Sequence, residues 1–234
     1  MVAKSTPRCE KAEGETELKR QLTWRARFDK KNLDYRITNI LPVSDLPRKS
    51  MRWSCPVYFD QFDEPSCTGF ATIHAAIAEP FPVQGLTPTH ARYLYQRAKE
   101  LDQWPGEDYD GSSVLGAVAA AKEFGYFLKY GWCFIEKEIN AAVCYHGPVI
   151  MGTNWTEGMM EPDEQGIIRA TGKTLGGHAY PIMGYDHKTG LYRIHNSWGV
   201  SFGVMGDVFI RVEDLAKLMS DGAEACIPLL KPGA

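Results

Sequence analysis

The sequence lacks the features by which several protein classes are recognised. None of its apolar runs approaches the roughly 18 residues that a membrane-spanning helix requires. Residues 1–27 are rich in charge and contain no apolar stretch of the kind found in a secretory signal. The net charge of −3 gives no electrostatic reason to expect a nucleic acid or an anionic membrane as a partner. We therefore expect a cytoplasmic protein that acts on neither.

The cysteines do not form the short-spaced pairs typical of zinc sites, so we expect neither a metal nor a cofactor. Without a secretory signal, free thiols in a reducing compartment are favoured over disulfides. The six cysteines are Cys9, Cys55, Cys67, Cys133, Cys144 and Cys226.

The chain is long enough for two lobes, and the predicted secondary structure differs between its two halves. Its 234 residues, 44% hydrophobic and 24% charged, are typical of a globular protein. Helical patterns dominate before residue 130 and strand patterns after it. We predict an α+β fold with a mobile N-terminal segment (1–35), a helical lobe (36–130) and a lobe built on a β-sheet or barrel (131–234). A cleft should lie between the two lobes of a monomer.

Apolar periodicity and end signals locate the elements. Helices are predicted from Cys67 onward and over 87–101, 112–124 and 136–146, and Thr87 and Pro88 suit the start of the second. Gly125 is placed to end the third helix. Strands separated by glycine turns are predicted over 149–155, 166–170, 178–185, 191–196 and 208–212.

Cys67 is the candidate nucleophile. It follows a polar loop and stands where the helical pattern of Phe70, Ile73 and Ile77 begins. A thiol at a helix N-terminus faces unpaired N–H groups and the positive end of the helix dipole, and both favour the thiolate. A buried cysteine with no chemical role is the alternative interpretation.

His178 is the candidate base. The strand that contains it and the strand that ends at Asn196 are expected to form a hairpin, with both residues near its open end. An imidazole that a carboxamide orients is what a cysteine enzyme needs. His74 lies about 10 Å further along the helix from Cys67, too far to serve. His195 should point to the face of the strand opposite Asn196.

Gln61, Cys67, the stretch Gly-Gly-His178-Ala and the stretch Asn196-Ser-Trp-Gly, in this order, resemble the papain-like cysteine peptidases. The resemblance covers roughly residues 50–212. It implies that Cys67 attacks the substrate, that His178 is its base and acid, and that Asn196 orients His178. Gln61 and the Cys67 N–H would form the oxyanion hole. A peptide or protein would be the substrate.

The resemblance also implies roles for three residues along the cleft. Trp198 would shield the hydrogen bond between His178 and Asn196 from water. Gly177 precedes the base, and Gly111 stands where the family has a glycine that binds the substrate backbone. A turn glycine before the next helix is an equal interpretation of Gly111.

Several positions depart from the family pattern. Thr68 replaces the usual tryptophan after the nucleophile, Glu64 replaces a loop cysteine, and Phe202 replaces a second tryptophan. Asp63 and Glu64 bring two carboxylates close to Cys67. They would either disfavour acidic residues on the leaving-group side or simply be solvated. These differences favour a divergent bacterial or phage branch. A thiol amidase or transglutaminase-like acyl transferase, and a papain-like binding protein without activity, are the alternatives.

Overall fold

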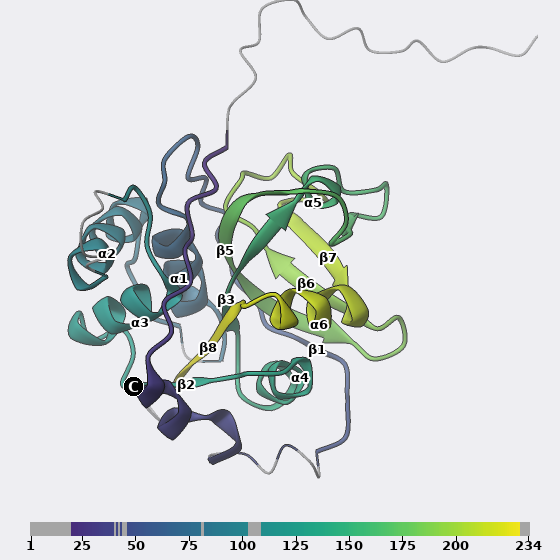
Figure 1. The fold of residues 1–234 in the computed structure, drawn as a ribbon, viewed down its shortest axis with the longest axis horizontal. Helices are drawn as coiled ribbons and strands as arrows, with labels where there is room; N and C mark the ends of the chain where they lie inside the picture. The colour runs from purple at the N-terminus through teal and green to yellow at the C-terminus, as the bar shows by residue number, and fades with distance from the viewer. Residues whose placement is uncertain are drawn as a thin grey trace, which may run out of the picture.

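Two lobes lie side by side in the computed structural model, which describes residues 20–39, 41, 43, 46–80, 82–102 and 109–229. Helices α1 (Cys67–Ile77), α2 (Pro88–Leu101) and α3 (Val114–Glu123) form one lobe, and a sheet forms the other (Figure 1). Helix α4 (Glu136–Tyr145) packs against the sheet. The four predicted helices are confirmed, and their ends lie within two residues of the predicted ones.

Local signals explain where the helices begin. Thr87 and His90 form a capping box at the start of α2, where Pro88 takes the first helical position. The Ser113 hydroxyl accepts a hydrogen bond from the Gly116 N–H at the start of α3. Gly125 has a φ of +77°, the left-handed conformation expected of a glycine that follows a helix.

The sheet is largely antiparallel, and among the described strands it stays open and does not close into the barrel that the sequence allowed. All five predicted strands are present. They are β3 (Val149–Thr156), β4 (Ile167–Ile168), β5 (Thr174–Asp186), β6 (Leu191–His195) and β7 (Asp207–Arg211). Elements that the sequence did not predict are β1 (Met51–Arg52), β2 (Lys129–Trp132), β8 (Glu224–Leu229), α5 (Glu157–Met160) and α6 (Val212–Ser220). The strand order is β2-β8-β3-β5-β6-β7-β4, and β1 pairs with β5.

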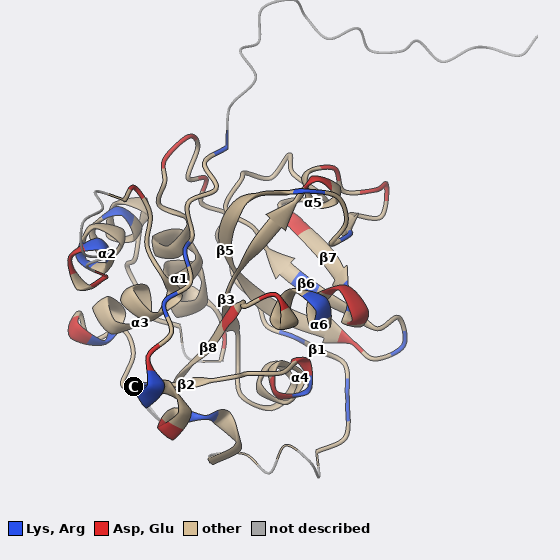
Figure 2. Cartoon of the chain, in the orientation of Figure 1, with Lys and Arg blue, Asp and Glu red and all other residues tan. Residues whose placement is uncertain are grey.

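The central strands contribute to two hydrophobic cores at once. On β3, Ile150 faces the core of the helical lobe while its neighbours Val149 and Met151 face the core of the β-rich lobe. On β5, Ala179 faces the core of the helical lobe and Tyr180 faces the core of the β-rich lobe. Because successive side chains of a strand point to opposite faces, a strand buried on both sides reads as a continuous apolar run. Figure 2 shows the charged residues gathered mainly on outer helices and loops.

The N-terminal part of the described chain lies between the two lobes. Residues 20–27, which we name the cleft segment, run past α1 and β5 before the short 3-10 helices η1 (Lys30–Tyr35) and η2 (Ile37–Asn39) (Figure 1). Trp24 in this segment is buried. Residues 20–27 thus contact both lobes, whereas residues 1–19 lie outside the described residues, so the mobile segment expected for 1–35 stays a prediction. In the part of the chain that is described, no helix is long and apolar enough to cross a membrane.

Candidate active site

Cys67 is the first residue of α1, as predicted, and its side chain is buried. The preceding Ser66 makes no side-chain cap to this helix, so its hydroxyl does not use the N–H groups of the first turn. The thiol lies within hydrogen-bonding reach of the backbone of Ala179 and Thr68 and of both the side chain and the backbone of Thr23. Ala179 follows His178 on β5, so the nucleophile and the candidate base come from adjoining segments of the two lobes.

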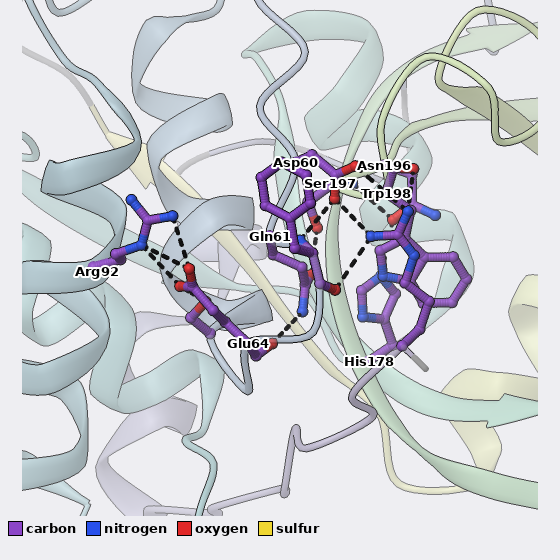
Figure 3. A network of polar contacts seen from close by, with 11 residues as sticks. Asp60, Gln61, Glu64, Arg92, His178, Asn196, Ser197 and Trp198 are labelled. Carbon is purple, nitrogen blue, oxygen red and sulfur yellow. Dashed lines mark hydrogen bonds and ion pairs between the residues drawn. The ribbon is translucent and has the colours of Figure 1, made fainter. Parts of the chain in front are cut away.

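His178 and Asn196 form the predicted pair. The His178 Nε2 atom lies 2.9 Å from the Asn196 Oδ1 atom (Figure 3). The amide oxygen can only accept, so the imidazole carries its proton on Nε2 and leaves Nδ1 with a free lone pair. Nδ1 is buried and has no hydrogen-bond partner within the described residues. An unprotonated ring nitrogen of this kind is the acceptor that a thiol proton requires.

Two tryptophans enclose the imidazole. The ring centroids of Trp198 and His178 are 4.6 Å apart, and those of Trp155 and His178 are 4.9 Å apart. Trp198 lies beside the His178–Asn196 pair (Figure 3), in the position expected of a shield. The contact between Trp155 and the imidazole was not predicted from the sequence. Both rings pack against the imidazole of His178.

Gln61 is held in one orientation by contacts from both lobes. Its N–H donates to the Ser197 carbonyl oxygen over 2.9 Å, and its side-chain Oε1 accepts from the Ser197 hydroxyl over 2.6 Å. Its Nε2 donates one hydrogen bond to the Glu64 carbonyl oxygen. The second N–H of this amide is a donor that is not used in that bond. Glu64 turns its carboxylate to Arg92, which offsets the charge (Figure 3).

The cleft segment covers this site. The Trp24 N–H donates to the Gly177 carbonyl oxygen over 2.8 Å on one wall, and the Arg25 N–H donates to the Ser112 carbonyl oxygen over 3.2 Å on the other. Thr23, between them, lies at the thiol of Cys67. The segment is therefore bound along the cleft by its backbone, in the way that a peptide would be.

Gly111 and Gly177 allow this close approach. A Cβ atom at Gly111 would lie 2.0 Å from the Thr23 carbonyl oxygen, and one at Gly177 would lie 2.0 Å from the Trp24 carbonyl oxygen. A peptide backbone could not lie where the segment lies if either position had a side chain. Both glycines thus border the path of the bound backbone.

Trp24 fills a pocket whose polar end is Glu224. The indole N–H donates to Glu224 Oε2 over 2.8 Å, and the Val114 N–H donates to the same oxygen over 2.8 Å. A Cβ atom at Gly152 would lie 2.0 Å from the indole nitrogen, so the glycine keeps the pocket open. Burial raises the pKa of the Glu224 carboxyl to about 7. This pocket could not be predicted from the sequence, because no local pattern marks Glu224 or Gly152.

Burial also sets the protonation of the central pair. It raises the pKa of the Cys67 thiol, although hydrogen bonds from Ala179 and Thr23 act in the opposite direction. It lowers the pKa of His178 to about 4, and the nearby Arg20 guanidinium lowers it further, against the hydrogen bond to Asn196. With the cleft segment in place, a neutral thiol and a neutral imidazole are therefore favoured over an ion pair.

The remaining histidines and cysteines do not join the site. His74 is buried and accepts a hydrogen bond from the Phe59 N–H, and His195 pairs with Asp207, so both lie apart from the pair formed by His178 and Asn196, as expected. The other described cysteines are free and buried, namely Cys55, Cys133, Cys144 and Cys226, while Cys9 lies outside the described residues. No group of three metal-ligating side chains occurs among the described residues.

Comparison with known proteins gives a match over most of the chain. The family model described as "Papain family cysteine protease" matches residues 59–224. A curated relative, cathepsin B-like cysteine proteinase 4 of Caenorhabditis elegans, is 34% identical over 92 residues. That match covers 38% of this chain and only 27% of the relative, or about a quarter of its length.

Solved structures share the fold at low sequence identity. Xylellain, a cysteine protease from Xylella fastidiosa, superposes with a TM-score of 0.63 at 16% identity and covers 90% of this chain and 92% of its own. ProCathepsin B S9 from Trypanosoma congolense gives 0.60 at 12% identity, with 91% and 87% covered. Digestive procathepsin L 3 of Tenebrio molitor larval midgut gives 0.56 at 15% identity, with 80% and 72% covered.

Proposed function

The chain belongs to the papain family of cysteine proteases, and we propose that it hydrolyses peptide bonds through an acyl-thioester on Cys67. The observation that supports this most is the state of His178. Its Nε2 is bound to Asn196 while its Nδ1 has no partner, on the strand whose next residue contacts the thiol. The base is thus already oriented, with its free lone pair available for the thiol proton.

The reaction divides between the two lobes. Cys67 gives its proton to His178 Nδ1 and attacks the substrate carbonyl carbon, and the resulting oxyanion accepts hydrogen bonds from the Cys67 N–H and from Gln61 Nε2. His178 then donates the proton to the leaving nitrogen, and the C–N bond breaks. A water molecule, deprotonated by His178, attacks the thioester and releases the acid and the free thiol. Asn196 holds the ring in place throughout.

We infer that the covered form is latent. A substrate must present its leaving nitrogen to His178, so the chain after the scissile bond runs past Trp198, which covers that imidazole. The cleft segment has the opposite direction, because its earlier residue Arg20 lies at Trp198 and its later residue Trp24 pairs beside Ser112. No peptide bond of the segment then stands in the orientation for cleavage. Activity requires that the segment leave the cleft.

The cleft walls indicate how a substrate is held. Gly111 and Gly177 would lie along its backbone, as they do along that of the segment. The pocket filled by Trp24 would accept an apolar or aromatic side chain on the acyl side, and Glu224 would accept a hydrogen bond from one that carries an N–H or O–H group, such as tryptophan or tyrosine. Trp198 would border the leaving-group side.

An active-site label tests the reaction. We expect an epoxysuccinyl reagent at pH 6–7 under reducing conditions to add once to the full chain, slowly because the cleft segment must first leave, as read by intact mass, and Cys67→Ala to take up none. The same substitution should abolish the hydrolysis of peptides and leave the fold intact. A Cys67→Ala protein that still hydrolyses peptides at the original rate would rule out the mechanism. If neither the native chain nor a Trp24→Ala variant is labelled, the alternative of a binding protein without activity stands.

The other enzyme alternative is less favoured by the site. A transglutaminase-like acyl transferase or amidase commonly uses an aspartate as its third group, and here the third group is the carboxamide of Asn196. We propose that the enzyme works as a monomer on peptides or proteins in a reducing, cytoplasmic compartment. The free state of the described cysteines supports the reducing compartment.

A further inference from the structure

We infer that Asp60, with the carbonyl oxygens of Phe62 and Trp198, forms a subsite for an arginine side chain on the leaving-group side of the cleft. The inference rests on the proposed peptidase function. It starts from Arg20 of the cleft segment, whose guanidinium occupies this place. Its NH1 lies 2.6 Å from Asp60 Oδ1 and 3.2 Å from the Phe62 carbonyl oxygen. Its NH2 lies 2.8 Å from the Trp198 carbonyl oxygen and 3.4 Å from Asp60 Oδ2.

The subsite is built by loops of the enzyme body and does not depend on Arg20 for its shape. Asp60 Oδ1 also accepts a hydrogen bond from the Phe62 N–H over 2.7 Å, which fixes the carboxylate. Asp60 and Trp198 pair as an antiparallel bridge. Gly199 has a φ of +76°, and a Cβ atom there would lie 2.6 Å from Asp60 Oδ2. The loops thus leave room for a carboxylate beside the tryptophan (Figure 3).

The chemistry of the subsite favours a planar cation. It presents one carboxylate and two carbonyl oxygens, all acceptors, and the fork of a guanidinium can donate to all three at once. The Arg20 guanidinium carbon also lies 6.0 Å from the centre of the Trp198 ring, within reach of a cation–π contact. A glutamine carries too few donors and no charge, and a glutamate would be repelled. The side chains of Asp60 and Arg20 are 21% and 16% exposed, so the site is accessible yet partly shielded from solvent.

A substrate side chain can reach the subsite. Arg20 precedes Thr23 by three residues, a span of about 10 Å in an extended chain. Thr23 lies at the thiol. A substrate in the productive direction covers the same span with the second or third residue after its scissile bond. An arginine at one of those positions would therefore meet Asp60 once the cleft segment has left.

The test uses the full chain with Arg20→Ala, which frees the subsite, and internally quenched peptides. Every variant named in this test and its controls also carries Trp24→Ala, so that the cleft segment is released. The peptides carry an aromatic residue on the acyl side and either arginine or glutamine at the second or third position after the scissile bond. We expect kcat/KM to be roughly tenfold higher for an arginine peptide than for its glutamine partner, as for a partly shielded charged contact. In Arg20→Ala/Asp60→Asn the ratio should fall to near one.

A matched control removes a charge from the same loop. Asp63 is exposed, and Arg20→Ala/Asp63→Asn should keep the preference for arginine. If Asp60→Asn and Asp63→Asn lower the ratio equally, the preference is a general charge effect and the subsite is overturned. An unchanged ratio in Arg20→Ala/Asp60→Asn overturns it as well, and Arg20 is then only an anchor of the cleft segment.

Two further measurements distinguish a failure of the subsite from a failure of the proposed peptidase function. A coumarin amide that ends at the scissile bond reports hydrolysis without using the leaving-group side. Fluorescence polarisation of the arginine and glutamine peptides on Arg20→Ala/Cys67→Ala reports binding without hydrolysis. Tighter binding of the arginine peptide that depends on Asp60, in a protein that does not cleave the coumarin amide, would keep the subsite and reject the peptidase. Equal binding of both peptides, with the coumarin amide cleaved, would do the reverse.

Discussion

At the scale of single residues, the site depends on how His178 is held. Its ring has one hydrogen-bonded nitrogen and one buried nitrogen without a partner, and two tryptophans restrict its movement. The orientation comes from Asn196, whereas the proton transfer itself uses only the imidazole. Loss of the orienting residue should therefore weaken catalysis, and loss of the imidazole should remove the step.

This distinction predicts an order of effects. His178→Ala should lower kcat by roughly 100- to 10,000-fold, the contribution of general acid–base catalysis, because no other imidazole or carboxylate is recorded at the thiol among the described residues. Asn196→Ala should lower kcat less, since the ring between Trp155 and Trp198 retains part of its orientation. Steady-state kinetics with a coumarin amide would measure both, with the exposed Asn39→Ala as a control. Equal losses for the two variants would contradict the division of roles.

At the scale of elements, the cleft segment is the feature that decides accessibility. It contributes backbone hydrogen bonds to both walls, the buried indole of Trp24 and the guanidinium of Arg20. Of these, the indole buries the most apolar surface and donates to Glu224. The free energy that holds the segment in the cleft should therefore depend most on Trp24.

Trp24→Ala should accelerate the labelling of Cys67. Removal of a large buried side chain costs a few kcal/mol, about 3 for a tryptophan, and here the cost falls on the bound state of the segment. The alkylation rate should rise at least tenfold, as followed by intact mass over time. Phe28→Ala is the matched control, because this aromatic residue follows the segment but is 66% exposed. An equal rise in both variants, or a rise in neither, would show that Trp24 does not hold the segment.

Part of this element-level picture could be predicted from the sequence. The helices that carry periodic apolar positions and clear caps, such as α2 with Thr87 and Pro88, were found nearly to the residue. Strand β8 was missed because Glu224 and Pro228 interrupt its short apolar pattern. Glu224 stands in the strand because it completes the pocket of Trp24. Pro228 pairs with Tyr130 of β2, a partner that is distant in the sequence.

The candidate site, too, could be predicted only in part from the sequence. Cys67, His178 and Asn196 were identified because each stands in a recognisable local stretch, and the structure brings His178 and Asn196 into contact. The cleft segment was not predicted, since residues 20–27 carry one tryptophan among charges and have no period of their own. Its place depends on partners such as Gly177 and Ser112, which are remote in sequence. Only tertiary contacts distinguish such a segment from a solvated tail.

At the scale of the whole molecule, a buried polar cluster joins the sheet to the loop that leads into α1. The Arg193 guanidinium donates to Asp207 Oδ2 over 2.6 Å, and His195 Nδ1 lies 3.2 Å from Asp207 Oδ1. His195 Nε2 donates to the Val57 carbonyl oxygen over 2.8 Å. The ring of His195 also meets the edge of the His74 ring of α1, with the centroids 4.7 Å apart. The cluster therefore ties both lobes together behind the active site.

The stability of the fold should depend on pH through His195. Burial lowers the pKa of this imidazole, but the hydrogen bonds to Asp207 and Cys55 outweigh it and raise the pKa from 6.5 to about 9. A raised pKa stabilises the fold fully below pH 6.5, and this contribution is lost as the pH rises through about 9. The free energy of unfolding should fall by roughly 3 kcal/mol over this interval. Urea unfolding between pH 6 and pH 9.5 would measure the decrease.

His195→Gln should flatten this dependence, because the amide does not titrate. The exposed His187 provides the matched control, and His187→Gln should keep the slope of the native chain. A His195→Gln protein with an undiminished slope would place the titrating group elsewhere. The test reports on the junction of the lobes, and it does not involve His178 or Cys67.

The sharing of β3, β5 and β8 between two cores has a consequence for control of the enzyme. A hinge motion that widened the groove would have to pull β3, β5 and β8 out of both hydrophobic cores at once. The two walls of the groove are therefore held at a fixed distance from each other. Control of the enzyme can then act through the segment that occupies the groove. Activation then requires that the cleft segment be displaced. A competing chain, or a single cleavage near the start of the segment, could displace it without disturbing the rest of the protein.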